Sequence, residues 1–326
     1  MKQIIACTFL LLSAFLYACH RPVTNVADYG QFIQPGVKNA DLQQLDTEIS
    51  FWQQRIDRDM NDITAESTLA GLLARRFARS GSMAELYASD SLYKKVNKLN
   101  SKNSSGTYRA LAANCITMHR FRQAQLYIDS ALALGDDKYL TILQEFDVAM
   151  ELGNYVRAKQ ALQSLENKNS FDYLIRESKY TDHVTGDLDA AIEMMERAYS
   201  KLPENIPGAL YVWVKSNLGD MYSHGNRFRD AYKSYLLALE KDPHDYHALK
   251  GIAWLAFSHD RDIDNAKKIV NYLKTVHPVP DYELLLAEIA AFENDTISQK
   301  KHGHNFLSGV KNGMYGDMYN KYVFNL

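Results

Sequence analysis

The chain has 326 residues, of which 46% are hydrophobic and 23% are charged, a composition typical of a folded protein and not of a disordered one. The formal net charge is −2, with 37 Lys and Arg against 39 Asp and Glu, so the charge gives no reason to expect nucleic acid as a partner. Three cysteines exclude a disulfide framework.

The first segment, residues 1–18, predicts a secretory signal peptide. Lys2 supplies the positive start, and residues 4–15 are almost wholly apolar but too short for a transmembrane helix. Residues 16–19 (LYAC) resemble the lipobox of bacterial lipoproteins, which implies that Cys19 is acylated and becomes the mature N-terminus. The alternatives are a plain signal peptide cut nearby and an anchor that is never cut.

Residues 19–40 are expected to form the lipidated cysteine and a flexible tether. The part after Cys19 holds two of the seven prolines and shows no helical period. No later run reaches 18 unbroken apolar residues, so no second membrane span is expected. We therefore expect an exported protein, anchored by lipid in the cell envelope, on the periplasmic side of the outer membrane, with the cell surface as the alternative.

The folded body begins with residues 41–104, which predict one leading helix and one degenerate capping helix pair. Apolar residues recur at helical spacing through 41–59, and a second helical stretch over 64–99 is split by Ser80-Gly81-Ser82.

The clearest internal repeat lies at residues 212–245. Its small residues let two helices approach closely, tyrosines fill the space between them, and a proline ends the second helix. The residues concerned are Leu218, Gly219, Tyr222, Ala231, Tyr235, Ala238 and Pro243. They resemble the tetratricopeptide repeat, a helix–turn–helix unit of about 34 residues. The position of Ala231 recurs in phase at Ala124, Ala158, Ala191 and Ala266.

This resemblance covers roughly residues 64–310 and implies an all-α fold, a right-handed superhelical α-solenoid of antiparallel helix pairs. About five repeats are expected over 105–281. C-terminal capping helices and an aromatic tail, guessed to be a short closing helix, are expected over 282–326. No stretch alternates with period two, so no sheet is predicted. The layout is similar to that of exported, lipid-anchored tetratricopeptide proteins of Gram-negative bacteria, including the Bacteroidota, which implies a scaffold and no reaction.

Two sets of residues invite a catalytic or metal-binding interpretation. Cys115 and His119 are spaced as a nucleophile and its base on one helix, but Cys115 falls on a position that packs between helices, where a free cysteine serves as a small apolar residue. His302 and His304 lack a Cys, Asp or Glu ligand close in sequence, and the neighbouring lysines favour a solvated helix or turn.

Asp260, Asp262 and Asp264 resemble the opening of a calcium loop. The glycine and the bidentate glutamate that such a loop needs are replaced by Asn265 and Asn271, so an acidic helix cap explains the aspartates better. The sequence contains no phosphate-binding glycine loop and no hydrolase or metalloprotease motif. We therefore expect no enzyme activity, no cofactor and no metal.

The resemblance also implies a concave groove lined by the first helix of each repeat. Aromatic and charged residues at the groove positions favour a protein or peptide ligand, with a glycan or small solute as the alternative. The residues expected there are Arg176, Tyr180, Trp213, Asp220, His224, His247, Lys250, Trp254 and Phe257. A slip of one residue in helix phase would instead place Trp254 and Phe257 in the core.

Overall fold

The computed structural model describes residues 21–34, 39–100 and 104–323, and these ranges contain helices and turns but no strand. The predicted signal peptide and Cys19 lie outside the described residues. The chain divides into two compact units. Unit 1 comprises Gly208–Tyr272 with the described residues up to Gln34, and unit 2 comprises the described residues of Pro35–Pro207 and Leu273–Leu326.

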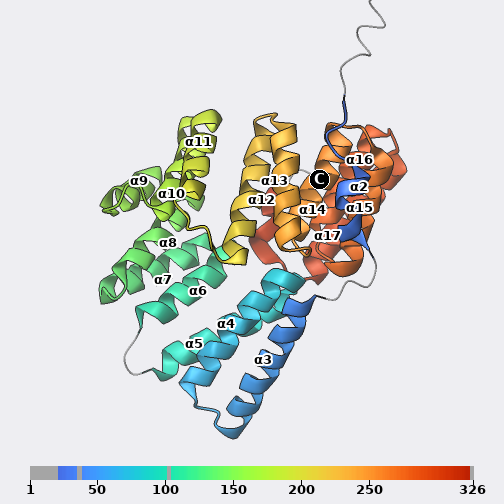
Figure 1. Cartoon of the computed structure of the whole chain (residues 1–326). Helices are drawn as coiled ribbons and strands as arrows, with labels where there is room; N and C mark the ends of the chain where they lie inside the picture. The colour runs from blue at the N-terminus through green and yellow to red at the C-terminus, as the bar shows by residue number, and fades with distance from the viewer. Residues whose placement is uncertain (1–20, 35–38, 101–103, 324–326) are drawn as a thin grey trace, which may run out of the picture. The chain divides into compact units, whose positions relative to one another are not determined.

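Unit 2 is built of helices that pack against their neighbours in chain order, as antiparallel pairs (Figure 1). The α10 helix, Phe171–Tyr180, continues through a π-helical turn, Thr181–Thr185. The helices are α3 Ala40–Arg58, α4 Ile63–Ser80, α5 Met83–Leu99, α6 Ser105–Thr117, α7 Phe121–Leu134, α8 Lys138–Glu151, α9 Tyr155–Ser164, α10 Phe171–Tyr180, α11 Leu188–Ser200, α16 Asp281–Phe292, α17 Thr296–Asn312 and α18 Asn320–Val323.

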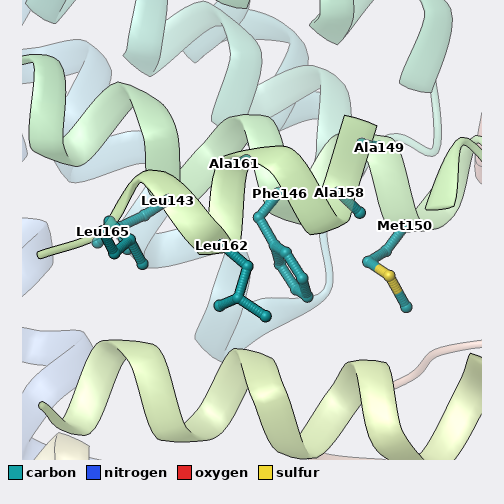
Figure 2. Close-up of a cluster of buried hydrophobic side chains, with 8 residues drawn as sticks. All are labelled: Leu143, Phe146, Ala149, Met150, Ala158, Ala161, Leu162 and Leu165. Carbon is teal, nitrogen blue, oxygen red and sulfur yellow. The ribbon is translucent and has the colours of Figure 1, made fainter. Parts of the chain in front are cut away.

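The α8 and α9 helices contribute side chains to one buried apolar cluster. Phe146 of α8 and Leu162 of α9 are fully buried in one cluster with Ala158, and in the close-up both side chains point from the pair toward a third helix (Figure 2). Four alanines in the same phase as Ala158 are also fully buried, which confirms the repeat phase expected from the sequence: Ala124, Ala191, Ala231 and Ala266.

The aromatic tail closes unit 2 against α5. Tyr315 and Tyr319 pack with Phe306 of α17 and with Leu86 of α5, and the Tyr315 hydroxyl donates to the Gly81 carbonyl at 3.0 Å. Residues Gly316–Tyr319 form a 3₁₀ turn that leads into the four-residue helix α18.

Unit 1 contains two helix pairs and the N-terminal segment. Its pairs are α12 Gly208–His224 with α13 Phe228–Lys241, and α14 Tyr246–Ser258 with α15 Ile263–Val276. The last turn of α15 lies beyond the unit boundary. The segment before α3 forms α2, Val26–Tyr29, and a 3₁₀ turn, Gly30–Ile33.

This N-terminal segment corrects the expectation of a flexible tether over 19–40. Residues 21–34 are packed onto unit 1, with Tyr29 only 1% exposed and Phe32 buried. The backbone N–H groups of Val23 and Thr24 each donate to the Asp260 carboxylate at 2.8 Å. Hydropathy periodicity missed the segment because two aromatic side chains and one carboxylate, not an amphipathic stripe, hold it.

Candidate functional site

Two parallel helices of unit 1, α12 and α14, bring a group of polar side chains together. His247 Nε2 lies 2.7 Å from Asp220 Oδ2, and the hydroxyl of Ser216 donates to the carboxylate of Asp245. Asp245 also caps α14, since its side chain accepts from the Ala248 backbone N–H. The pairs join α12 to the first turn of α14.

Two glycines allow this close arrangement around the Tyr235 ring. A Cβ added at Gly219 on α12 would lie 2.6 Å from Tyr235 Cδ1, and one added at Gly251 on α14 would lie 2.6 Å from Cε2. Both distances are far shorter than a Cβ contact allows, so the ring of this α13 residue occupies the space that two side chains would otherwise fill.

The Tyr235 hydroxyl connects the interior to the polar group. It donates to Asp220 Oδ1 at 2.7 Å and lies 3.5 Å from the hydroxyl of Ser223. Asp220 therefore receives a buried tyrosine on one oxygen and His247 on the other. Because both oxygens are engaged, the carboxylate is held in a single orientation.

The electrostatics of the group favour an ion pair. Burial alone would raise the pKa of Asp220, but the hydrogen bond and charge of His247 and the Tyr235 hydroxyl outweigh it and hold the pKa below its usual value. Burial alone would lower the pKa of His247, and the Asp220 carboxylate instead raises it. Burial raises the pKa of Asp245.

The two tryptophans expected in the groove lie on either side of this polar group. Trp213 precedes Asp220, and Trp254 follows His247, by seven residues each, which is about 10 Å along a helix. The Trp213 side chain is 43% exposed. Trp254 is half-buried, with its ring centroid 6.5 Å from that of Phe228 on α13. The two rings do not form one aromatic site.

Phe257 is buried, contrary to the sequence-based expectation that it lines the groove. It is 9% exposed and belongs to the core of unit 1. The α14 helix is apolar around most of its circumference, because it also buries Leu249, Ile252 and Leu255. A pattern so nearly uniform does not reveal which side of a helix faces outward.

The remaining expected groove residues fall into two groups. His224 is exposed at the end of α12, and Lys250 is half-buried on α14. Arg176 and Tyr180 belong to unit 2, where they connect α10 to the preceding helices. Arg176 Nη2 lies 2.7 Å from Asp147 Oδ2, and the Lys159 ammonium lies 4.6 Å from the Tyr180 ring centre.

The alternative catalytic and metal candidates have structural partners. Cys115 is 1% exposed, and burial raises its pKa to about 11, so the thiol is a packing residue. His302 of α17 lies 2.6 Å from Glu283 of α16. Within the described ranges, no group of three or more His, Cys, Asp or Glu side chains is placed to hold a metal ion.

The calcium-loop aspartates also have other roles. Asp262, rather than Asp264, caps α15 by accepting from the Asn265 N–H at 3.1 Å. Asp260 anchors the N-terminal segment and lies 2.6 Å from His259 Nδ1. Sequence reasoning missed this role, because the partners of Asp260 lie more than two hundred residues away along the chain.

Sequence reasoning also missed a cavity of about 610 Å3 at the start of α13. Its lining includes Arg21 of the N-terminal segment, Arg227 and Arg229 at the helix start, and His259 after α14. The Arg227-Phe228-Arg229 sequence was a visible signal. No sequence signal indicated that Arg21 lines the same cavity, because its position there depends on the tertiary packing.

Comparison with known proteins shows the fold. The chain resembles a tetratricopeptide repeat protein from Parabacteroides merdae, with 12% identity, coverage of 82% of this chain and 93% of that one, and a TM-score of 0.50. Yeast Tom70 is 13% identical, with 87% and 66% covered and a TM-score of 0.53. A chain of the APC/C hetero-tetramer Cut9–Hcn1 is 15% identical, with 72% and 44% covered and a TM-score of 0.53.

No family model and no curated protein sequence matches the chain. The structural matches nevertheless agree with the packing of helices in pairs. The chain therefore has the tetratricopeptide-repeat fold, an all-α solenoid of antiparallel helix pairs, as the sequence predicts. Among the described residues, no helix is both long enough and apolar enough to cross a membrane.

Proposed function

We propose that this chain is a lipid-anchored, non-enzymatic scaffold of the cell envelope that binds a protein or peptide on its α12–α14 face. We define that face by its exposed and half-buried groups: Trp213, Asp220, His224, His247 and Lys250. The tetratricopeptide fold supports an interaction role, because stacked helix pairs offer a long continuous surface. A fold alone does not give a function, so the proposal depends on this face.

The observation that carries the proposal is the exposed Trp213 ring, two helical turns before the Asp220 of an ordered ion pair on the same helix. Tryptophan is enriched among the residues that dominate binding energy at interfaces, and burying 43% of such a ring is favourable. Asp220 and His247 are already fixed by their mutual contact and by Tyr235, so binding orders few side chains there.

The chemistry of the face favours a polypeptide segment. Asp220 and His247 are 37% and 50% exposed while paired, so they offer one acceptor and one donor group at a fixed separation. An extended peptide presents alternating N–H and C=O groups along its backbone, which suits such a pair, and an apolar side chain of the peptide would cover Trp213.

The partner is tested by capture from the organism's own envelope fraction. Wild type, Trp213→Ala and Phe51→Ala are compared; Phe51 is an exposed aromatic residue on α3, remote in sequence from the face. We expect a protein that is retained by wild type and Phe51→Ala and reduced about tenfold or more by Trp213→Ala, as for a residue that dominates binding. Equal retention by all three would contradict the use of this face.

The anchor is tested separately, by labelling cells with radioactive palmitate and comparing wild type with Cys19→Ser. We propose that the label depends on Cys19 and that the protein fractionates with the outer membrane, facing the periplasm. An unlabelled wild type would contradict the lipid anchor and leave the binding face untouched. A saccharide that quenches tryptophan fluorescence in wild type but not in Trp213→Ala, with no captured protein, would replace the peptide by a glycan.

A further inference from the structure

The cavity at the start of α13 gathers positive charge without a matching amount of negative charge. Its lining includes three arginines and one aspartate, Asp230. Asp230 Oδ2 lies 2.9 Å from Arg227 Nε, and the Arg227 guanidinium also stacks 4.3 Å from the Tyr222 ring centre. Arg227 thus has partners within the protein, and Arg21 and Arg229 are the two arginines left to consider.

Arg21 and Arg229 have no hydrogen-bond or ion-pair partner among the residues that the structure describes, and both side chains are exposed. They come from parts of the chain far apart in sequence and line the same cavity. Two positive side chains that line one cavity without a carboxylate partner raise the local potential, which favours the binding of an anion there.

The cavity is held open by fixed elements. The wall that contains Arg21 is anchored two and three residues later, where Asp260 accepts from the N–H groups of Val23 and Thr24 and from the Thr24 hydroxyl. On another side, the His259 ring packs 4.6 Å from the Phe228 ring, and His259 Nδ1 is bound to the same Asp260. The two arginines are therefore presented from a rigid frame.

We propose that this cavity binds the phosphate group of a phosphorylated ligand, with Arg21 and Arg229 as its main contacts. A guanidinium donates two parallel hydrogen bonds to phosphate oxygens, and two guanidinium groups match the charge of a phosphate. A cavity of about 610 Å3 is much larger than phosphate alone, so the group is one end of a larger molecule.

Two kinds of ligand present such a phosphate group: a phospholipid headgroup and a soluble phosphorylated compound. Cys19 precedes Arg21 by two residues, which span at most about 7 Å. A lipid on Cys19 would therefore keep the cavity near headgroups. The phosphate site itself does not depend on the anchor, and the experiment is arranged to separate the two.

The test uses the full chain carrying Cys19→Ser, so that no acyl chain contributes to binding. The probes are inorganic phosphate, followed by calorimetry, and vesicles of phosphatidylcholine with or without phosphatidylglycerol, followed by flotation. The test variant is Arg21→Gln with Arg229→Gln. The matched control is Arg122→Gln, because Arg122 is the exposed second residue of α7 and follows the same Arg-Phe sequence as Arg229.

We expect phosphate to bind, and the double variant to weaken binding about tenfold or more, since each charged hydrogen bond lost is of that order. The Arg122→Gln control should bind as before. Binding only to the phosphatidylglycerol vesicles, with the same dependence on the two arginines, would assign the phosphate to a lipid headgroup. No binding to either probe, or equal weakening by the control, would overturn the proposal. Circular dichroism of all variants verifies that they fold.

Discussion

The turn between α6 and α7 and the turn between α12 and α13 both lead into the sequence Arg-Phe-Arg, whose first arginine is the N-cap residue of the next helix. In each, the residue before that sequence has a positive φ, 55° at His119 and 57° at Asn226. The first arginine N–H then donates to a carbonyl five residues back at 2.8 Å, Arg120 to Cys115 and Arg227 to Tyr222. The same residues give the same local backbone in two different units.

The interiors of the two pairs differ at equivalent positions. Where α12–α13 has Gly219 and Tyr235, α6–α7 has Ala112 and Ile128, and all four are buried. A glycine facing a tyrosine ring and an alanine facing an isoleucine fill similar space between the helices. The repeat therefore sets the distance between the two helices. The two side chains that fill the space between them differ from repeat to repeat, and they change together.

The exteriors differ more. The positions of Asp220 and His247 are occupied in the earlier repeats by Ala113 and Leu140, both exposed. The tyrosine hydroxyl that orients Asp220 has no counterpart in Ile128. A polar face on α12 and α14 thus depends on the glycine–tyrosine pair beneath it, which is why the interior and the face have to be tested together.

The largest expected effect comes from exchanging the interior residues. Gly219→Ala should destabilise the chain by about 1–3 kcal/mol, because its Cβ would overlap the Tyr235 ring and force the helices apart. The double variant Gly219→Ala, Tyr235→Ile copies the α6–α7 pair and should be less destabilised than the sum of its single changes. Thermal unfolding followed by calorimetry measures both effects.

The reverse substitution gives the control. Ala112→Gly should cost about 1 kcal/mol, the usual penalty of glycine inside a helix, with no overlap to relieve. If Gly219→Ala caused no loss of stability, Tyr235 would have room to move and the interpretation of the two pairs as alternative fillings would be wrong.

The next effect concerns the N-terminal segment, which covers the α13 start. Asp260→Ala removes the acceptor of the Val23 and Thr24 N–H groups, at a cost of about 1–3 kcal/mol for groups left without a partner. We expect faster hydrogen exchange in residues 21–34, measured by mass spectrometry. Asp264→Ala, an exposed aspartate four residues later, serves as the control and should leave exchange unchanged. Equal exchange in the two variants would show that the buried Tyr29 and Phe32 side chains hold the segment in place without Asp260.

The smallest effect is the pH dependence of the Asp220–His247 pair. The lowered pKa of Asp220 gives stability that is present above its unfolded-state pKa and is lost as the pH falls through the folded value. The raised pKa of His247 gives stability that is present below its unfolded-state pKa and is lost as the pH rises through the folded value. The pair is therefore strongest between about pH 4 and pH 6.5.

Because both side chains are more than a third exposed, the stabilisation within that window should be no more than about 1 kcal/mol. The sharper measurement is an NMR titration of His247. Asp220→Asn should lower the pKa of His247, and Tyr235→Phe should lower it less. A His247 titration unchanged by Asp220→Asn would show that the two side chains do not interact in solution.

Several elements were predictable because their signals are local. The Ser80-Gly81-Ser82 break ends α4 at Ser80, where Gly81 takes a φ of 69° and its N–H bonds to Phe77. The alanine phase marked the helix contacts correctly. Which residues line the candidate site was less predictable. Phe257 is part of the core, Trp254 packs on Phe228, and the Arg176 side chain pairs with Asp147 of another helix. Periodicity measures the apolar face of one helix, and these outcomes depend on neighbouring helices.

The sequence by itself determined the repeat, because small residues at a fixed period are the condition for two helices to pack closely, whatever surrounds them. Tertiary structure alone decided which surfaces carry chemistry. Tyr235 meets Asp220 across a helix pair, and Asp260 binds Val23 and Thr24 from the other end of the chain. These contacts depend on where distant segments arrive in space, and no pattern within a single repeat specifies that.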